Sequence, residues 1–580
     1  MRTNELKSRT LTSAPTSPGQ YWRNLATAGV RDRVFTSTVL IVAFTALYMV
    51  TQARYYTFDA VSYAHSIYRY DSVGDLYALF HPHHLLFNLT GWILWKLAHV
   101  FGYIGGPLEV LKTMNAVLGA VGIAILSLAL RSVLTRSRAL AVLFPIGLGV
   151  SFGYWVCATD GRVNMPSNVL LIASFYALVL TMQSPSKRRA LMTGLLSALS
   201  LLYHESAGLF VIVAFIGIWL GEYPQGTAVE EHRTRRTLLG VFFLTWLLVT
   251  VIPYAVVGLG VLHLTSPEGF KDWAARYAVL GWWWDFHIIH NLRLDIYAIR
   301  KCLFTEPTGK QGTFHIAHGE SDMGFVIYMT ALGIWLFAVY LATIALPLLL
   351  RTHYRPYLIV TIIWGAVNTA FFTIWQPEYF VFRVPTIISS ALLLAMVASH
   401  YRAKRSGQVW LLGIGVWVAL IGISNYIQNI GPHENPKSNP YLALANDIKH
   451  RTGPQDIFVL AGTGYLEPDE VYIPYFAKRA VFSIHTEMSH NHENYAAMKS
   501  SLIDTMNATR AAGGSVYVLN DIYDQGIALA ALSKQHGLSQ AMLNDLFVGQ
   551  VRSKAWKTKS GQPVWKMSPL PVKLPQLPRE

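Results

Sequence analysis

Apolar runs of membrane-spanning length recur along the first three quarters of the chain, with short polar segments between them. They lie at about residues 34–52, 110–130, 140–156, 166–182, 190–203, 207–221, 238–260, 324–350, 357–375, 384–399 and 409–426. A helix of about 20 apolar residues crosses the hydrocarbon core of a bilayer. The pattern therefore predicts a mainly α-helical, polytopic membrane protein with about 11 transmembrane helices.

A further apolar segment, at 85–101, contains Asn88, Lys96 and His99 and could be a span or an amphipathic helix on the outer surface; the distribution of basic residues over the loops favours the surface helix. With this segment left out of the count, most basic loop residues fall on one side: Arg131, Arg136, Arg138, Lys187, Arg188, Arg189, Arg233, Arg235, Arg236, Arg351, Arg355, Arg402, Lys404 and Arg405. The short loops of the other side carry only Arg162 and Arg383. Since cytoplasmic loops collect Lys and Arg, the first group is expected inside.

This assignment sets the predicted topology. The basic N-terminal segment, residues 1–33, is cytoplasmic, and a transmembrane module spans 34–428 with long outer loops at 53–109 and 261–323. From residue 429 onward, β-rich runs at 456–461, 479–484 and 515–519 alternate with helical patterns at 440–451, 493–511 and 526–547. A small C-terminal α/β domain is expected at 429–570, on the extracytoplasmic (periplasmic) side of the plasma (inner) membrane, followed by a tail at 571–580.

Composition supports a membrane protein, since 53% of the residues are hydrophobic and 14% are charged. The net charge of +15 follows from the basic inner loops, so nucleic acid is not an expected partner. Cys157 and Cys302 are the only cysteines, which excludes a disulfide framework and leaves open whether the two pair. No phosphate-cradling Gly-rich motif is found, and chemistry is therefore expected outside, without a cytoplasmic nucleotide.

Ionisable residues gather at the predicted outer ends of the helices: Asp59, His81, His83, His84, Asp160, Glu205, Glu378 and Arg383. Such residues at one level of a membrane suggest a shared pocket. Asp59 is the strongest candidate, because Ser62 and Tyr63 share its helical face and could orient the carboxylate toward a bound hydroxyl.

Several of these residues allow more than one interpretation. The sequence His81-Pro82-His83-His84 could bind phosphate as imidazolium, ligate a divalent metal together with Asp59 and Asp160, or simply begin a helix, where Pro is favoured. Asp160 could close an Asx turn. Glu205 could serve only to keep its turn polar. Arg383 has the fork geometry that suits a lipid phosphate.

The order of these features resembles the GT-C superfamily of membrane glycosyltransferases, which use polyprenyl-phosphate sugars. The resemblance rests on Asp59 soon after the first span, a His-Pro motif opening the surface helix, Asp160 as a second outer acid, and Arg383-Val384-Pro385 near the penultimate spans. It is closest to the bacterial branch related to protein O-mannosyltransferases and the lipid A aminoarabinose transferase. In that family Asp59 would match the catalytic acid and Asp160 the second acid. The chain departs from the branch at Phe80-His81, where the aminoarabinose transferase has an acidic-basic pair.

The resemblance implies transfer of a sugar from a polyprenyl-phosphate donor to a hydroxyl of a lipid, polysaccharide or protein, on the outer face of the membrane. We expect an inverting reaction with Asp59 as general base, Asp160 as a second catalytic acid, and substrate contacts from His81, His83, His84, Glu205, Glu378 and Arg383. Two alternatives remain: an oligosaccharide ligase or polymerase that uses polyprenyl-diphosphate-linked glycans, and a lipid or sugar transporter. The form of the donor distinguishes the ligase or polymerase from the glycosyltransferase: a diphosphate carrying many sugars against a monophosphate carrying one. Transporters place polar groups at the membrane midplane rather than at the outer ends of helices.

Overall fold

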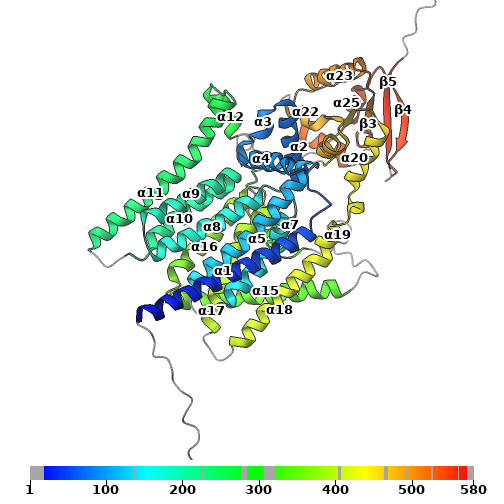
Figure 1. The fold of residues 1–580 in the computed structure, drawn as a ribbon. Coiled ribbons are helices and arrows are strands. Elements are labelled where there is room, and N and C mark those ends of the chain that lie inside the picture. The colour runs from blue at the N-terminus through cyan, green and yellow to red at the C-terminus, as the bar shows by residue number, and fades with distance from the viewer. Residues whose placement is uncertain are drawn as a thin grey trace, which may run out of the picture.

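The computed structural model describes residues 18–134, 137–223, 227–275, 284–305, 322–402, 407–462, 468–490, 493–523, 527–558 and 561–570. Residues 1–17 of the predicted cytoplasmic segment and the predicted tail at 571–580 lie outside the described residues. The described part is a bundle of long, slanted helices that carries a small β-sheet at one end (Figure 1).

Eight helical segments among the described residues are long and apolar enough to cross a membrane: Gly29–Val50, Pro107–Val133, Asn164–Gln183, Ala228–Val261, Val326–Leu349, Arg355–Ile374, Phe380–Tyr401 and Gln408–His433. A ninth results if α6 (Leu140–Gly149) and α7 (Phe152–Thr159), which meet at a bend of 64°, form one broken span. The chain is thus a polytopic, mainly helical membrane protein. The other two predicted spans are also helical, but they are shorter, at α9 (Lys187–Tyr203) and Glu205–Leu220. The number of 11 crossings stays a prediction.

The helices of the bundle follow the predicted apolar runs closely. Their bounds are α1 (Pro18–Val50), α5 (Pro107–Val133), α8 (Asn164–Gln183), α10 (Phe210–Leu220), α11 (Ala228–Ala255) with the π-helical η3 (Val256–Val261), α15 (Asp322–Leu349), α16 (Arg355–Ile374), α17 (Val384–Arg402) and α18 (Gly407–Asn425) with the π-helical η5 (Tyr426–Ile430). They share one large hydrophobic core, in which α8 packs on α5 and α9, and α16 packs on α17. Cys157 and Cys302 are both buried and are free thiols.

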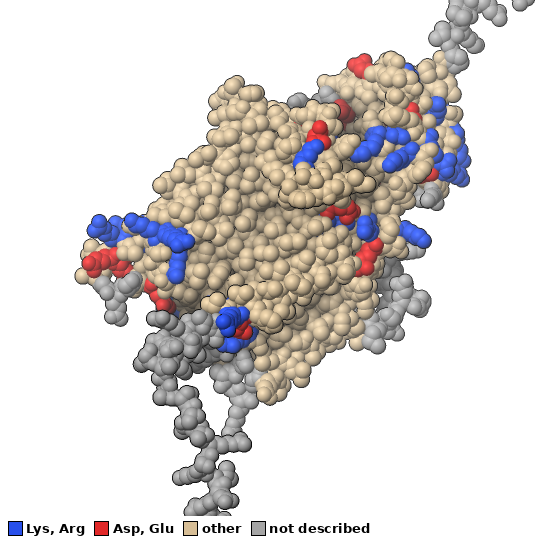
Figure 2. All heavy atoms as spheres, in the orientation of Figure 1, with Lys and Arg blue, Asp and Glu red and all other residues tan. Residues whose placement is uncertain are grey.

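Charged side chains gather at the two ends of the bundle and over the sheet, and the broad surface between them carries few on the face seen in Figure 2. A surface with few charged side chains is what a bilayer requires of a lipid-facing region. At one end Arg131, in the last turn of α5, donates to Asp32 of α1 at 2.8 Å. Both residues were predicted to lie on the cytoplasmic side. The orientation of the chain in the membrane stays a prediction.

The segment after α1 forms short helices at the opposite end of the bundle: α2 (Phe58–Val73), α3 (Leu76–Leu79), η1 (Pro82–His84) and α4 (Phe87–Val100). With 14 residues, α4 is too short to cross the hydrocarbon, and it exposes Ile93 and Leu97, as a helix on a membrane surface would. The described parts of the long loop 261–323 form α12 (Pro267–Ala274) and α14 (Ile288–Leu303). Two 3₁₀ turns, η2 (Glu205–Leu209) and η4 (Phe380–Arg383), complete this end.

The C-terminal part contains a five-stranded sheet of order β2-β1-β3-β5-β4. The strands β1 (Ile457–Leu460), β2 (Ala480–Ser483) and β3 (Val516–Leu519) are parallel and fall inside the predicted β-rich runs. The strands β4 (Gln550–Lys557) and β5 (Pro563–Pro569) are antiparallel to their neighbours and were not predicted. The remaining elements are α19 (Gly431–His433), η6 (Pro436–Ser438), α20 (Pro440–Arg451), α21 (Asp469–Tyr472), η7 (Ile473–Ala477), α22 (Ile484–His490), α23 (Tyr495–Ala511), η8 (Asn520–Ile522), α24 (Ile527–His536) and α25 (Gln540–Asp545).

A second hydrophobic core joins the sheet region to the end of the bundle that carries α2. It contains Val61 and Ile67 of α2, Leu111 of α5, and Phe458 and Tyr472 of the C-terminal part. Because α2 contributes to this core, the C-terminal part packs directly on the helix that carries Asp59.

Candidate active site

Asp59 lies in the first turn of α2, close to the positive end of the helix dipole, which favours an ionised carboxylate. Thr57 begins the helix as its N-cap, since its side chain accepts from the Ala60 amide at 3.4 Å. The same hydroxyl donates to Oδ2 of Asp160 at 2.6 Å. One threonine therefore both begins the Asp59 helix and links it to the second predicted acid.

A chain of hydrogen bonds runs from Asp160 to Asp59. Oδ2 of Asp160 accepts from Nε of Arg162 at 3.2 Å, and Nη1 of Arg162 donates to the Tyr379 hydroxyl at 3.0 Å. Tyr379 in turn donates to Oδ2 of Asp59 at 3.1 Å. These four residues come from α2, the turn after α7 and the turn before η4, so the fold brings together segments that are far apart in the sequence.

Hydrogen bonds from the segment before α2 and from α5 hold the turn that contains Asp160. The Ala53 amide donates to the Thr159 carbonyl at 3.2 Å. The buried amide of Asn115, on α5, donates to the carbonyls of Asp160 and Arg162, each at 2.7 Å. The turn is therefore fixed from two sides, and the position of the Arg162 side chain is fixed with it.

The environment of Asp59 shifts the pKa of its carboxyl group. Burial raises the pKa of its carboxyl, and the nearby charge of Asp160 adds to the increase. The charge of Arg162 and the hydrogen bond from Tyr379 oppose it. Burial also raises the pKa of Tyr379, so this hydroxyl keeps its proton and donates it to the carboxylate in a hydrogen bond. Such a carboxylate is more basic than a solvated one and has the properties of a general base.

Asp160 is almost fully buried, and its carboxylate is engaged within the protein. Oδ1 accepts from the Gly161 amide at 2.9 Å, as in an Asx-type turn, while Oδ2 takes the bonds from Thr57 and Arg162. Asp160 thus forms the predicted Asx-type turn and also contacts the residues that lead to Asp59. Asp160 is therefore placed to orient the side chain of Arg162.

The histidine segment forms η1, with Pro82 at its first position and the His81 side chain accepting from the His83 amide. The rings of His81 and His84 stack, with centroids 4.3 Å apart, and Tyr63 contacts His84 edge-on at 4.7 Å. Burial and the neighbouring histidines hold the pKa of His84 well below its ordinary value. His84 is therefore a neutral imidazole near pH 7 and can offer a hydrogen bond, but not the positive charge expected of an imidazolium.

Glu205 and His83 are brought together from distant parts of the chain. Nδ1 of His83 contacts Oε1 of Glu205 directly, at the start of η2. The preceding residue, His204, caps η2 and contacts the Ser206 hydroxyl at 2.8 Å. Glu205 thus orients the histidine segment, in addition to keeping its turn polar.

Arg383 and Glu378 lie outside this cluster of contacts. Arg383 is fully buried, pairs with Asp295 of α14 at 2.5 Å, and donates to the carbonyls of Phe372 and Pro377. Its charge is compensated inside the protein, which differs from the expected contact with a lipid phosphate. Glu378 is exposed.

Among the residues that the structure describes, no group of three or more His, Cys, Asp or Glu side chains is placed to hold a metal ion. Asp59, Asp160 and the histidine segment therefore do not converge on a shared metal position there. Tyr379 and Arg162 were not among the predicted site residues, although they connect the two acids. Their sequence signals were weak, since Tyr379 stands in an aromatic segment typical of a membrane interface and Arg162 in a polar turn.

Comparison with solved structures shows that the chain has the fold of ArnT, a GT-C member, which confirms at the level of the fold the resemblance inferred from the motifs. The structure of ArnT from Cupriavidus metallidurans bound to undecaprenyl phosphate aligns over 91% of this chain and 97% of its own, with a TM-score of 0.56 and 12% sequence identity. The apo form of ArnT aligns over 93% and 98%, with a TM-score of 0.55 and 12% identity. The Archaeoglobus fulgidus oligosaccharyltransferase in its apo form aligns over 94% of this chain and 75% of its own, with a TM-score of 0.48 and 12% identity.

No protein-family model matches the sequence, and no curated protein matches it significantly. At 12% identity the likeness to ArnT concerns the fold.

Proposed function

We propose that the protein is a membrane glycosyltransferase that moves a sugar from a polyprenyl-phosphate donor to a hydroxyl group of an acceptor, with Asp59 as general base. The observation that carries this proposal is the hydrogen-bonded chain from Asp160 through Arg162 and Tyr379 to Asp59, at one end of a GT-C fold. The polyprenyl-phosphate donor is supported by ArnT, which shares the fold and is bound to undecaprenyl phosphate in its solved structure.

In the proposed reaction the carboxylate of Asp59 accepts the proton of the acceptor hydroxyl. The acceptor oxygen forms the new bond to the anomeric carbon of the sugar. The bond between that carbon and the phosphate oxygen breaks, and polyprenyl phosphate leaves with the electron pair. A single displacement of this kind inverts the anomeric centre. Asp160 and Arg162 act as positioning residues, because their contacts fix Tyr379 and, through it, the Asp59 carboxylate.

The leaving phosphate needs hydrogen-bond donors that stabilise its developing charge rather than a strong acid. We propose that the His81–His84 segment binds the leaving phosphate. In this segment the rings of His81 and His84 stack, and His84 contacts Tyr63 of α2. Glu205 orients His83 within this segment. Arg383 has no part in the phosphate contact, since Asp295 compensates it. Exposed Glu378, next to Tyr379 in sequence, is the candidate for contact with the acceptor.

The proposed site lies at the end of the bundle opposite the Arg131–Asp32 pair. With the basic loops in the cytoplasm, transfer takes place at the outer face of the plasma membrane, and the C-terminal part lies in the periplasm. A polyprenyl chain in the bilayer would keep the anomeric carbon at the depth of the lipid headgroups, where the ionisable residues of the site gather.

The test uses the purified full chain in detergent, radiolabelled polyprenyl-monophosphate sugars and a cell-envelope extract as the source of acceptor. Asp59→Asn should lower turnover about 10²- to 10⁴-fold, the contribution of a positioned general base, while binding of undecaprenyl phosphate is retained. The matched control is Asp71→Asn, on the same helix, because Asp71 contacts Trp92 and Lys96 of α4 and not the site.

Turnover by Asp59→Asn close to that of the unmodified protein would refute the role of Asp59. Transfer only from polyprenyl-diphosphate-linked oligosaccharides would replace the proposal with the ligase alternative.

A further inference from the structure

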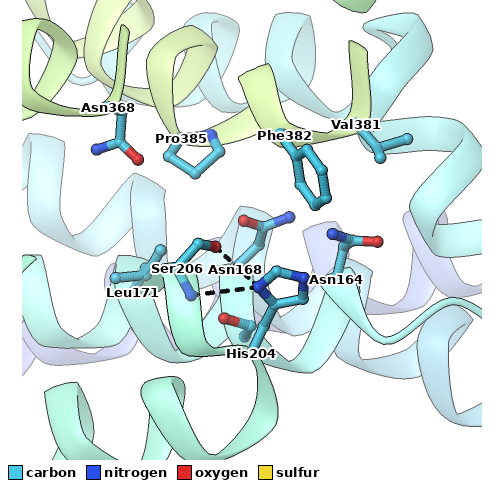
Figure 3. Close-up of a pocket in the computed structure, with 10 residues that line it drawn as sticks. Asn164, Asn168, Leu171, His204, Ser206, Asn368, Val381, Phe382 and Pro385 are labelled. Atoms are coloured by element: carbon cyan, nitrogen blue, oxygen red, sulfur yellow. Dashed lines mark hydrogen bonds between the residues drawn. The ribbon is translucent and has the colours of Figure 1, made fainter. Parts of the chain in front are cut away.

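A small polar cavity lies beside the candidate active site and has no part in the mechanism above. It is enclosed by α8, η2 and the residue before it, α16, η4 and the start of α17, and its lining includes Asn164, Ser167, Asn168, His204, Ser206 and Phe382. Figure 3 shows Asn164, Asn168, His204 and Ser206 on one side of the cavity and Val381, Phe382 and Pro385 on the other. The space suffices for about one water molecule or one hydroxyl group.

The residues of α8 that line the cavity form a stripe along one face of the helix. Asn164, Ser167, Asn168 and Leu171 follow the spacing i, i+3, i+4, i+7 and therefore share one face of the helix. The hydroxyl of Ser167 has a partner, because it donates to the Ser200 carbonyl at 3.1 Å, and the Ser200 hydroxyl donates to the Ser167 carbonyl at 2.7 Å. This part of the stripe is explained by the packing of α8 on α9.

The two asparagine amides are not explained in this way. Asn164 and Asn168 have exposed fractions of 8% and 4%, and neither side chain makes a hydrogen bond to another described residue. Nδ2 of Asn168 is completely buried without a partner. A buried amide without hydrogen bonds is costly, so one such group next to a cavity indicates a missing partner in that cavity.

The lining also defines the chemistry of that partner. It consists of amides, hydroxyls, an imidazole and apolar groups, with no Asp, Glu, Lys or Arg. Burial lowers the pKa of His204 to about 4, so this imidazole is neutral near pH 7. An alcohol both donates and accepts hydrogen bonds and suits such a lining. A carboxylate or an ammonium group would lose its hydration there without gaining an opposite charge.

The cavity lies between the two parts of the candidate active site. On one side the ring of Phe382 contacts the ring of Tyr379, with centroids 5.0 Å apart, and Tyr379 holds Asp59. On the other side His204 contacts Phe382 at 5.5 Å and is followed by Glu205, which binds His83. A sugar with its anomeric carbon between Asp59 and the histidine segment would therefore have this cavity beside its ring.

We propose that the cavity receives a hydroxyl group of the donor's sugar, and that the enzyme selects uncharged sugars over amino sugars and uronic acids at this position. This inference rests on the proposed function and adds the chemical class of the sugar to it.

The experiment measures binding to the full chain in detergent, without any acceptor, by the rise in melting temperature as lipid is added. The probes are undecaprenyl phosphate, and undecaprenyl phosphate carrying mannose, an amino-deoxy sugar or glucuronic acid. The unmodified protein should bind the mannose lipid about tenfold more tightly than bare undecaprenyl phosphate, and the two charged sugars no better than the bare lipid.

Asn168→Leu, which keeps the side-chain volume and removes the amide, should bind the mannose lipid no better than the bare lipid. Asn168→Asp should shift the preference toward the amino-deoxy sugar. The control Ser174→Ala also removes a buried polar group from α8, but its hydroxyl bonds only to the Leu170 carbonyl of its own helix, at 2.7 Å, and binding should not change. Retained binding of bare undecaprenyl phosphate shows that a variant is folded. Asn168→Ser replaces Asn168→Leu if the latter is not.

Three results would overturn the inference in distinguishable ways. If Asn168→Leu keeps the full preference for the mannose lipid, the cavity is a site for buried water and not for sugar. If the unmodified protein binds the amino-deoxy sugar as tightly as mannose, the selection of uncharged sugars is wrong. If it binds none of the four lipids, the proposed function itself fails, and the cavity loses its ligand with it.

Discussion

The protonation state of Asp59 is controlled by three side chains that lie around it. Burial and Asp160 favour the protonated carboxyl, whereas Arg162 and the Tyr379 hydroxyl favour the carboxylate. A general base has to be ionised before it can act, so the role proposed for Asp59 predicts activity above the pKa of its carboxyl and a loss of activity as the pH drops through that pKa. The hydrogen bond from Tyr379 keeps the base ionised to a lower pH.

Removal of the Tyr379 hydroxyl should therefore raise the pKa of Asp59. In Tyr379→Phe the pKa of Asp59 rises further, and the acidic limb of the profile of kcat/KM against pH should move to higher pH. The measurement is a pH profile of sugar transfer for both proteins. Tyr401→Phe is the control, since Tyr401 is in the last turn of α17 and not in the chain of contacts from Asp160 to Asp59. A limb that stays in place would show that Tyr379 does not tune Asp59.

Individual residues of the site were predictable to different degrees. Asp59, Asp160 and the His81–His84 segment stand out in the sequence because ionisable side chains are rare next to apolar runs. The role of Tyr379 could not be read in the same way, because a tyrosine between Glu378 and Phe380 has the composition of any membrane interface. The partner of Arg383 could not be predicted either, since Asp295 lies in α14, almost 90 residues earlier in the sequence.

At the scale of single elements, the Arg383–Asp295 pair fastens η4 to α14. Both side chains are almost fully buried, and the guanidinium also holds the carbonyls of Phe372 and Pro377. Since Tyr379 directly precedes η4, this fastening also places the hydroxyl that bonds to Asp59.

Loss of one member of this pair leaves a buried charge without compensation. Asp295→Asn should therefore destabilise the protein by about 3–5 kcal/mol, and the double variant Arg383→Met with Asp295→Leu should recover most of the loss. The measurement is the apparent melting temperature in detergent, with Arg293→Met, an exposed arginine of α14, as control. Equal melting of Asp295→Asn and the unmodified protein would contradict a structural role for the pair.

In the C-terminal part the three parallel strands were predictable because apolar residues mark them, and this includes the edge strand β2, which is buried only at its end. The runs at β1 and β3 are continuously buried, and apolar residues mark them in the sequence. The strand β4 is an edge strand that is exposed along most of its length and contains Arg552, Lys554 and Lys557. Charged residues protect an edge from pairing with other chains, and they also remove the apolar alternation by which a strand is recognised.

At the scale of the whole molecule, the C-terminal part packs on α2, the helix that carries Asp59. The hydroxyl of Tyr472 donates to the Tyr56 carbonyl at 2.6 Å and accepts from the Asn439 amide at 3.0 Å. Tyr56 directly precedes Thr57, which caps α2 and contacts Asp160. The hydroxyl of Tyr475 also accepts from the backbone amide of Leu108, at the start of α5. The contacts of the C-terminal part thus reach the segment that positions both acids.

This arrangement predicts that packing of the C-terminal part supports catalysis as well as stability. Tyr472→Phe removes two buried hydrogen bonds and should cost about 1–2 kcal/mol of stability. The same cost is expected for Tyr495→Phe, whose hydroxyl bonds to the Met542 carbonyl and Asp545 within the C-terminal part. Transfer activity should fall several-fold in Tyr472→Phe alone, because only Tyr472 is bonded to the residue before the cap of α2. Melting temperatures and transfer rates measured on both variants separate the two effects. If the rates of the two variants are equal, the C-terminal part contributes to stability and not to the placement of Asp59.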